Sequence, residues 1–452
     1  MSIIEEKLEV IKELNYWYEE RDKEYPEWYQ KRRKLAREIY EEYERKGMPI
    51  GKYGKDYDFT RYHSHLAKPH SQHQSLLELR EVERQYLQTI GARIDEEDRT
   101  GSHLQEDLDN TYTAFSESAK LKFLPKYPEG LVVMNPDEAV HKFSWIEDYF
   151  HRLVPLNLDK FAALASGYSI GGAFVWVKKG VVVELPLQAC FWIETNRFAQ
   201  LPYILVIAEP YSKVHIISGC VVEPTCPTGI HGCVTEIYVG KGAEVTFNII
   251  HNFKPGYWVS PKIGALVDEN GVYKENYISI GKHEATQLYP TVILRGKGSR
   301  ASIRSLFFGR GNSDMDIGAS VVFTGENTRA EIITRSVILD ESIVRMRGSL
   351  KGYIPTARGH LECRGLLLSD EAQAFAYPNL KSISPEAMLT HEAAIGKIAE
   401  EELHYLMSRG LSKSEATSMI VRGFLDTEIP GLPSLLQAEI NRLVSMTAEE
   451  VM

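Results

Sequence analysis

The sequence predicts a mainly β protein with a solenoid core and helical regions before and after it. Between about residues 166 and 385, short runs rich in β-branched and aromatic residues follow one another, separated by turn residues. No helix-length apolar period intervenes, which excludes strand–helix–strand winding and leaves a sandwich, a barrel or a solenoid. A weak internal repeat favours the solenoid.

Residues 1 to about 48 are expected to form two helices, because their apolar residues recur at helical spacing. Pro26 divides the two helices and Gly47 ends the second. The first 50 residues contain 13 acidic and 11 basic side chains, which is typical of a solvated or partner-facing arm. Residues 49–127 are polar and irregular, so 1–127 form the expected N-terminal region.

Four histidines lie close together in the irregular part of this region: His63, His65, His70 and His73. Metal binding is conceivable there, but a composition of this kind more often belongs to an exposed loop. The role of this segment therefore stays open.

Residues 128–385 are expected to form the β core, after a short helix near 137–152. Three segments within it share a turn, a small or basic residue, an alanine and an alternating strand. Their alanines are Ala243, Ala301 and Ala330. The first interval between these alanines is twice the second, which predicts whole coils of a β-helix with the length of the shorter interval.

Residues 386–452 are expected to form a helical tail. One helix is predicted over 399–409, and Ser412 with Glu415 forms a capping box at the start of the next, which runs to about Phe424. A final helix is predicted to end near Met446.

Composition narrows the class of protein. The net charge of -10 argues against nucleic acid as the main partner, because phosphate binding needs a clustered basic face. No run of about 18 apolar residues predicts a membrane span, and the first residues do not resemble a signal peptide. Five cysteines, an odd number in a long chain, fit a reducing cytoplasm better than a secreted disulfide scaffold.

The sequence contains no Walker A motif, nucleophile elbow, HExxH or dinucleotide fingerprint. No cysteine pair has CxxC spacing, so a zinc ribbon is not supported. Cys220, Cys226 and Cys233 are close enough in sequence to form a metal cluster, although buried cysteines more often serve as small hydrophobic residues.

Cys363 is the cysteine with the most reactive sequence context. Arg364 beside it and Arg358 nearby would favour a thiolate. Farther on, Thr390, His391 and Glu392 stand where the β core is expected to turn into the helical tail. Thiolate, imidazole and carboxylate are all competent iron ligands, but spacing alone does not bring these residues together. From the residues alone, a helix-start region is the more frequent role for His391 and Glu392.

Several segments carry a resemblance to a known family. They are 389–398 (LTHEAAIGKI), 402–410 (ELHYLMSRG), 418–424 (SMIVRGF), 174–181 (FVWVKKGV), 217–220 (ISGC) and, more loosely, the region after Pro26. These segments resemble the SufB/SufD family of iron–sulfur cluster assembly proteins, and the likeness covers most of residues 130–450.

The resemblance implies a fold, a set of partners and a cellular role. The fold would be a right-handed parallel β-helix between helical regions, in a cytoplasmic scaffold without enzymatic activity. The partners would be the ATPase SufC, docked on the C-terminal helical domain, and either SufD or a second SufB-type protomer. A cysteine desulfurase or sulfur carrier would supply sulfur, and no nucleic acid or membrane would be involved. The resemblance leaves flavin binding open.

Residue by residue, the resemblance assigns a nascent iron–sulfur cluster to Cys363, Glu392 and His391. It assigns persulfide sulfur to Cys220 and leaves Cys190, Cys226 and Cys233 as packing residues. The usual Gln-x-Trp element of the sulfur path is replaced by 251–253 (HNF), and Lys262 matches a lysine of that path only loosely. The N-terminal cysteine-rich segment of SufB is absent.

Three functions therefore stand against one another. Because SufD has glycine at the position of Glu392 and generally lacks the cysteine, the resemblance favours a cluster-holding SufB-type scaffold. A SufD-like structural partner that does not hold the cluster is the alternative. A β-helix enzyme acting on polysaccharide would need paired carboxylates in a groove, and the sequence offers no such cluster.

Overall fold

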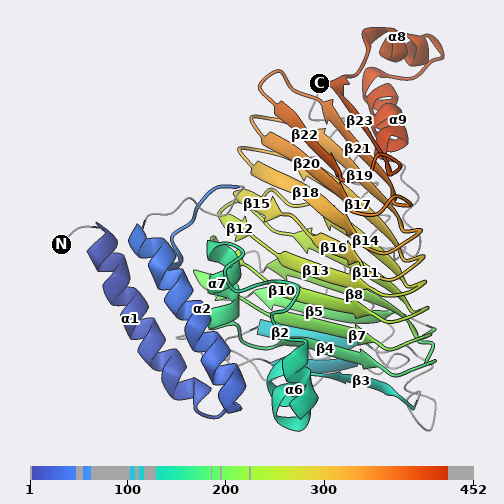
Figure 1. The fold of residues 1–452 in the computed structure, drawn as a ribbon. Coiled ribbons are helices and arrows are strands. Elements are labelled where there is room, and N and C mark those ends of the chain that lie inside the picture. Colours follow the sequence, from blue (N-terminus) through green and yellow to red (C-terminus); the bar gives the residue numbers. More distant parts are fainter. Residues whose placement is uncertain are drawn as a thin grey trace.

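The computed structural model describes residues 3–46, 54–62, 102–106, 111–116, 129–184, 186–193, 196–222 and 225–425, without the side chains of 3, 102–106, 111–116, 188, 190 and 192. It confirms a mainly β protein built on a parallel β solenoid of about eight turns, with helices at its N- and C-terminal ends (Figure 1). The predicted histidine-rich segment around His63 and the predicted final helix ending near Met446 lie outside the described residues.

The helices are α1 (Ile3–Asp22), α2 (Glu27–Lys46), η1 (Phe59–Arg61), α6 (Pro136–Lys142), η4 (Ser144–Asp148), α7 (Lys160–Tyr168), α8 (Glu400–Ser408) and α9 (Lys413–Leu425). The strands up to the middle of the chain are β1 (Ser102–Glu106), β2 (Thr111–Ser116), β3 (Leu131–Met134), β4 (Gly172–Val177), β5 (Leu187–Ile193), β6 (Phe198–Gln200), β7 (Tyr203–Ala208), β8 (Lys213–Val222), β9 (Gly229–His231), β10 (Val234–Val239), β11 (Glu244–Asn252) and β12 (Tyr257–Val259). The later strands are β13 (Lys262–Val267), β14 (Val272–Ser279), β15 (Ala285–Leu288), β16 (Thr291–Leu294), β17 (Arg300–Gly309), β18 (Asp314–Phe323), β19 (Arg329–Ile338), β20 (Ile343–Gly352), β21 (Arg358–Leu367), β22 (Gln373–Ser382) and β23 (Met388–Lys397).

Two long sheets face each other across the solenoid. The first has the order β1-β2-β5-β8-β11-β14-β17-β19-β21-β23, and its pairs from β5 onward are parallel. The second runs from β3 through β18 back to β6, with β20 joining β18 to β22. Each coil therefore adds one strand to the first sheet and one or two to the second.

The spacing of the coils confirms one part of the predicted repeat and corrects another. Ala301 pairs directly with Ala330, so these two alanines lie one coil apart as predicted. Ala243 does not belong to the same column, because Ala301 stacks on Tyr273 and then on Val245. Each of the two coils between Val245 and Ala301 is one residue shorter than the coil between Ala301 and Ala330, and the difference accumulates over the two coils.

Side chains alternate along each long strand, so that every second residue enters the interior of the solenoid. On the first sheet the inward residues include Ile249, Tyr277, Ile303, Leu361 and Cys363, all part of one continuous apolar core. The register keeps equivalent positions above one another from coil to coil. A residue's place in its strand thus decides whether it faces the core or the outside.

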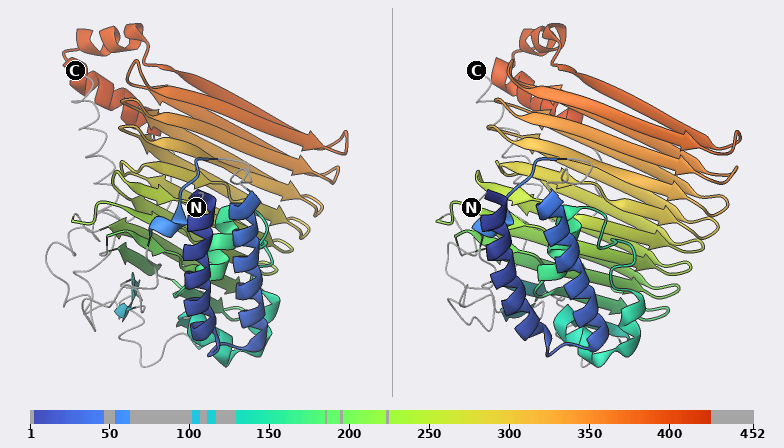
Figure 2. Two further views of the ribbon diagram at one scale, coloured as in Figure 1. Left: turned by 90° about the vertical axis from the view of Figure 1, so that its left-hand side faces the viewer. Right: turned by 60° about the vertical axis from the view of Figure 1, so that its left-hand side comes forward.

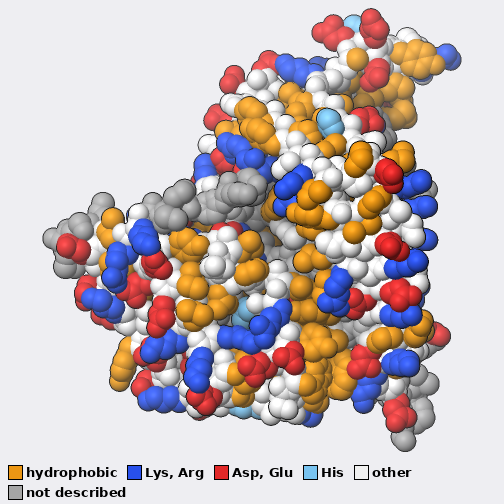
Figure 3. Space-filling model, in the orientation of Figure 1, with side chains coloured by type: hydrophobic (Ala, Val, Ile, Leu, Met, Phe, Trp, Pro, Cys, Tyr) orange, Lys and Arg blue, Asp and Glu red, His pale blue; other side chains and the backbone are white. Residues whose placement is uncertain are grey.

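The N-terminal helical pair packs against the outer side of the solenoid through a second apolar core that includes α7 (Figure 2). Pro26 separates α1 from α2, as predicted. At this bend Asp22 accepts from Arg33 Nε at 2.8 Å and lies 2.7 Å from Arg37 Nη1, and all three side chains are buried. Acidic and basic side chains are interspersed over the exposed surface of the pair (Figure 3).

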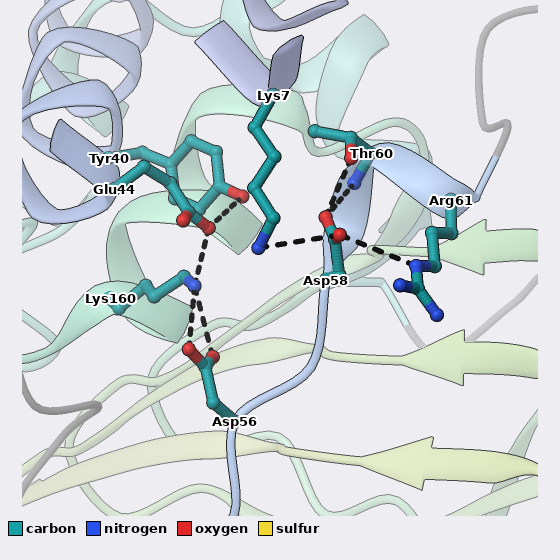
Figure 4. Close-up of polar contacts among 8 residues, drawn as sticks. All are labelled: Lys7, Tyr40, Glu44, Asp56, Asp58, Thr60, Arg61 and Lys160. Carbon is teal, nitrogen blue, oxygen red and sulfur yellow. Dashed lines mark hydrogen bonds and ion pairs between the residues drawn. The ribbon is translucent and has the colours of Figure 1, made fainter. Parts of the chain in front are cut away.

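A second polar cluster fixes α2 and the segment around η1 to α7 (Figure 4). Lys160 of α7 donates to both carboxylate oxygens of Asp56, at 3.0 and 3.1 Å, and also pairs with Glu44 of α2. Tyr40 donates to Glu44 at 2.9 Å, and Asp58 lies 3.3 Å from Lys7 of α1. These contacts join α1, α2, the segment around η1 and α7.

The single helix predicted near 137–152 is in fact α6 followed by η4, because the extended backbone of Phe143 separates them. At the other end, the predicted helix over 399–409 is present as α8. The predicted capping box is confirmed, since the Ser412 backbone donates to Glu415 at 2.7 Å and the Glu415 backbone donates to Ser412 Oγ at 3.2 Å.

The predicted turn into the tail at Thr390–Glu392 is wrong. These residues lie inside β23, which pairs with β21 over ten positions, and α8 begins only at Glu400. The inward position of Leu389 and the parallel pairing extend the β-helix by one strand. None of the described helices has the length and apolar character needed to cross a membrane.

Candidate functional site

The residues singled out by the sequence lie at two levels of the β-helix. Cys220 is on β8, whereas Cys363 is on β21 and His391 and Glu392 are on β23. Five strand steps separate β8 from β21 in the first sheet, which corresponds to about 24 Å at roughly 4.8 Å per step. An atom therefore cannot pass directly from Cys220 to Cys363, and its transfer requires intermediate positions.

Cys363 faces the interior of the β-helix. It is 1% exposed and stacks between Thr334 and Ala393 of the neighbouring strands. Burial raises the pKa of its thiol to about 11. The expectation that Arg364 favours a thiolate is wrong for this conformation, because the next residue in a strand projects to the opposite face. There Arg364 donates to Glu392 at 2.8 Å.

His391 shares the inward side of the sheet with Cys363. It pairs with Leu361, two positions before Cys363, so it is the diagonal neighbour of Cys363 on the same face. Because β23 is the last strand of the described sheet, His391 is exposed although it faces inward. Cys363 and His391 thus lie on the same face of the sheet, near the open end of the solenoid.

Glu392 projects to the outer face, where it pairs with Glu362 in the strand register. His360, Glu362 and Glu392 each offer a ligand atom, and these atoms lie within 4.8 Å of one another. Arg364 contacts both carboxylates, and Arg335 pairs with Glu362. The arrangement can hold a cation at the expense of the arginine contacts. Sequence reasoning missed Glu362 and His360, although their alternation around Cys363 was a usable signal.

Arg335 also connects this outer cluster to the C-terminal helices. Its guanidinium lies 5.9 Å from the ring centre of Phe424 on α9. Burial and the neighbouring Arg364 lower the pKa of Arg335 to about 10, which leaves it charged at neutral pH. A displacement of α9 would therefore be transmitted to Glu362 through Arg335.

Cys220 lies inside the β-helix with two histidines. It is 2% exposed and pairs in register with His251 of β11, while His231 of β9 comes from the opposite sheet. The ligand atoms of Cys220, His231 and His251 lie within 4.8 Å of one another. Sequence reasoning named Cys220 and His251 separately but did not predict that His231 joins them.

The remaining predicted residues are placed as follows. Cys226 and Cys233 are buried and form no disulfide, and burial raises the pKa of Cys233 to about 12. Phe253 is also buried, with its ring 5.3 Å from that of His231. Lys262 pairs with Asp159 at 2.7 Å and lies over a ring of α7, so it does not face Cys220. The side chain of Cys190 is outside the described residues.

Comparison with known proteins gives a consistent result. Residues 191–424 match the family described as "SUF system FeS cluster assembly, SufBD core domain". A protein of Methanothermobacter thermautotrophicus named "Iron-sulfur cluster assembly SufBD family protein" is 35% identical over 421 residues, which cover 91% of this chain and 99% of that protein.

Two further relatives carry the same family name. One from Archaeoglobus fulgidus is 37% identical over 372 residues, covering 82% of this chain and 96% of the relative. Another from Staphylococcus aureus is 32% identical over 328 residues, covering 71% and 70%. The likeness therefore extends over nearly the whole chain.

Proposed function

The chain belongs to the SufBD family of iron–sulfur cluster assembly proteins, and on this premise we propose that it is a SufB-type scaffold on which a nascent cluster is built. Membership of the family implies a role in SUF iron–sulfur cluster assembly. As a cytoplasmic scaffold the chain would carry out no reaction of its own, and ATP hydrolysis would take place in a SufC partner.

The proposed cluster ligands are Cys363, His391 and Glu392. The observation that carries this proposal is their common location on β21 and β23, the last two described strands of one sheet. The cluster is transient cargo, so a thiolate with exchangeable nitrogen and oxygen ligands suits it better than four thiolates would. Because Glu392 faces outward, all three ligands converge only if β23 shifts or a second protomer supplies one of them.

The open end of the solenoid supports a second protomer. Beyond β22 and β23, the described residues offer no further strand, so both present unpaired backbone edges. Large apolar side chains are exposed on this last coil: Phe375, Tyr377, Ile383, Met388 and Ile395. Edges and apolar patches of this kind are normally covered by a partner. We assign this role to SufD or to a second SufB-type chain.

The C-terminal helices are the proposed docking surface for SufC. No side chain of α8 is buried, and Tyr405, Met407 and Met419 are exposed on α8 and α9. A helix as short as α8 is marginal in water unless it packs against something, which favours a partner on this surface. The contact of Arg335 with Phe424 gives SufC a mechanical connection to the cluster strands.

Sulfur is proposed to reach Cys220 as persulfide from a cysteine desulfurase or carrier and to pass along the interior. A polar column leads from this level to Cys363, with Tyr277, Ser305 and Thr334 stacked in register. This column takes the place of the family's sulfur path through a lysine, because Lys262 is engaged with Asp159 outside the interior. Nothing in this route requires a flavin.

A second candidate is a SufD-like partner subunit that does not hold the cluster. The opposite orientations of Cys363 and Glu392 within one protomer favour it. Anaerobic reconstitution of the chain with its SufC partner, followed by absorption and Mössbauer spectroscopy, separates the two. A cluster that forms on a complex of only this chain and SufC supports the scaffold role. Cluster formation only when a separate SufB-type subunit is added overturns it.

A further inference from the structure

The buried group of Cys220, His231 and His251 has the form of a metal centre. Two of its residues are register neighbours on β8 and β11, and the third reaches across the interior from β9. All three ligand atoms lie within 4.8 Å of one another, although the residues come from both sheets. A cation at their centre would be within bonding reach after small side-chain adjustments.

The second ring nitrogen of each histidine is already engaged. His231 Nδ1 lies 2.8 Å from Gln200 Oε1, and His251 Nδ1 lies 2.6 Å from the hydroxyl of Tyr277. A carbonyl oxygen on Nδ1 of His231 fixes the tautomer whose Nε2 carries the lone pair. Outer partners of this kind orient the histidines of metal sites and raise their basicity as ligands.

The Nε2 atoms of His231 and His251 have no hydrogen-bond partner. Both Nε2 atoms are completely buried, and both histidines are 0% exposed. A buried polar atom without a partner is costly, and it calls for an explanation such as an ion. Two such atoms on histidines whose ligand atoms lie within 4.8 Å of a buried thiol are difficult to explain by packing alone.

We propose that Cys220, His231 and His251 bind one divalent first-row cation, such as Fe²⁺ or Zn²⁺, inside the β-helix. One sulfur and two imidazole nitrogens suit borderline cations and exclude Mg²⁺ and Ca²⁺, which require oxygen ligands. Three protein ligands leave the fourth tetrahedral position open for an exchangeable ligand. Binding displaces the thiol proton into solvent, so one proton is released per ion if the thiol is protonated beforehand.

The histidines are ready for this role at neutral pH. Burial lowers the pKa of His231 to about 3, and it lowers the pKa of His251 as well, so both rings are neutral and offer a lone pair. The inference shares Cys220 with the proposed sulfur route, but it does not depend on the cluster ligands, which lie about five strand steps away at Cys363.

The test uses the full-length chain, stripped of metal by a chelator and dialysed anaerobically against Co²⁺. Wild type is expected to bind one Co²⁺ at this site, with visible bands of tetrahedral Co²⁺ and a near-ultraviolet thiolate-to-cobalt band. Zn²⁺ and Fe²⁺ should displace it, whereas excess Mg²⁺ should not. Cys220→Ser should lose the thiolate band, and His231→Gln and His251→Gln should weaken binding at least about tenfold.

Matched controls are a buried histidine and a buried cysteine outside the group. His283→Gln and Cys226→Ala should keep both bands, and thermal unfolding should show that every variant is folded. Cys363→Ala should also keep them, which separates this site from the cluster proposal. Absence of tetrahedral bands in wild type, or equal Co²⁺ affinity in His231→Gln and His283→Gln, would overturn the inference.

Discussion

Cys363 and Glu392 lie on paired strands, one register position apart, and their side chains project from opposite faces of the sheet. Glu392 is level with Glu362, and Cys363 is level with Ala393. A separation of about one coil in sequence therefore brings the two close without bringing their ligand atoms together. If both hold one cluster, cluster binding includes a movement of β23 or a contribution from another chain.

This relationship predicts that the Cys363 thiol is protected in the isolated protein. Its pKa of about 11 lowers the thiolate fraction at pH 8 by about 200-fold relative to an ordinary cysteine, and burial restricts access further. Alkylation followed by mass spectrometry should show slow modification of Cys363, which becomes faster when SufC and ATP are added. Modification of the isolated chain at the rate of an exposed cysteine would contradict the buried position.

Glu275 provides a pH prediction. Burial raises the pKa of this carboxyl to about 7, whereas its pKa in the unfolded chain is about 4.3. Between these two pKa values the folded chain keeps a proton on Glu275 that the unfolded chain has already lost. The contribution of this proton to the free energy of unfolding is therefore complete below about pH 4 and is lost as the pH rises through 7.

Glu275→Gln removes this proton and keeps an acceptor for the Tyr273 hydroxyl, which donates to the carboxylate at 2.7 Å. From pH 4 to pH 8, the difference in free energy of unfolding between variant and wild type should shift by about 3 kcal/mol in favour of the variant, because only wild type loses stability over this range. Urea unfolding at both pH values measures this difference. Parallel pH profiles for the two proteins would show that Glu275 is ionised in the folded chain.

Asp22 is predicted to hold the N-terminal helical pair in place. Asp22→Ala leaves the buried guanidinium groups of Arg33 and Arg37 without their carboxylate, which should cost about 3–5 kcal/mol of stability. Limited proteolysis and thermal unfolding should both detect release of α1 and α2. The neighbouring Lys23→Ala removes only an exposed pair with Glu20 and should behave like wild type. Equal stability of the two variants would argue against the buried network.

The general fold could be predicted because strand alternation and turn residues repeat along the chain. Ala301 and Ala330 gave the coil length correctly, but Ala243 did not, since coil length changes by a residue between coils. His391 and Glu392 were assigned to a helix start because the parallel pairing that makes them a strand comes from β21, a full coil earlier in the chain. Pairing partners at this distance leave no local pattern.

The buried group around Cys220 escaped sequence reasoning for a related reason. His231 and His251 belong to different sheets, and their approach depends on the width of the solenoid rather than on spacing. By contrast, the capping box at Ser412 and Glu415 is a local signal, and it was predicted correctly.

The most direct test of the proposed scaffold role compares Cys363→Ala with Cys226→Ala, two buried cysteines of the same apolar core. Each variant is reconstituted anaerobically with SufC, and iron and acid-labile sulfide are measured per chain. The account predicts that Cys363→Ala stays folded, binds SufC and holds no cluster, while Cys226→Ala keeps the wild-type content. Wild-type iron and sulfide in Cys363→Ala would contradict it.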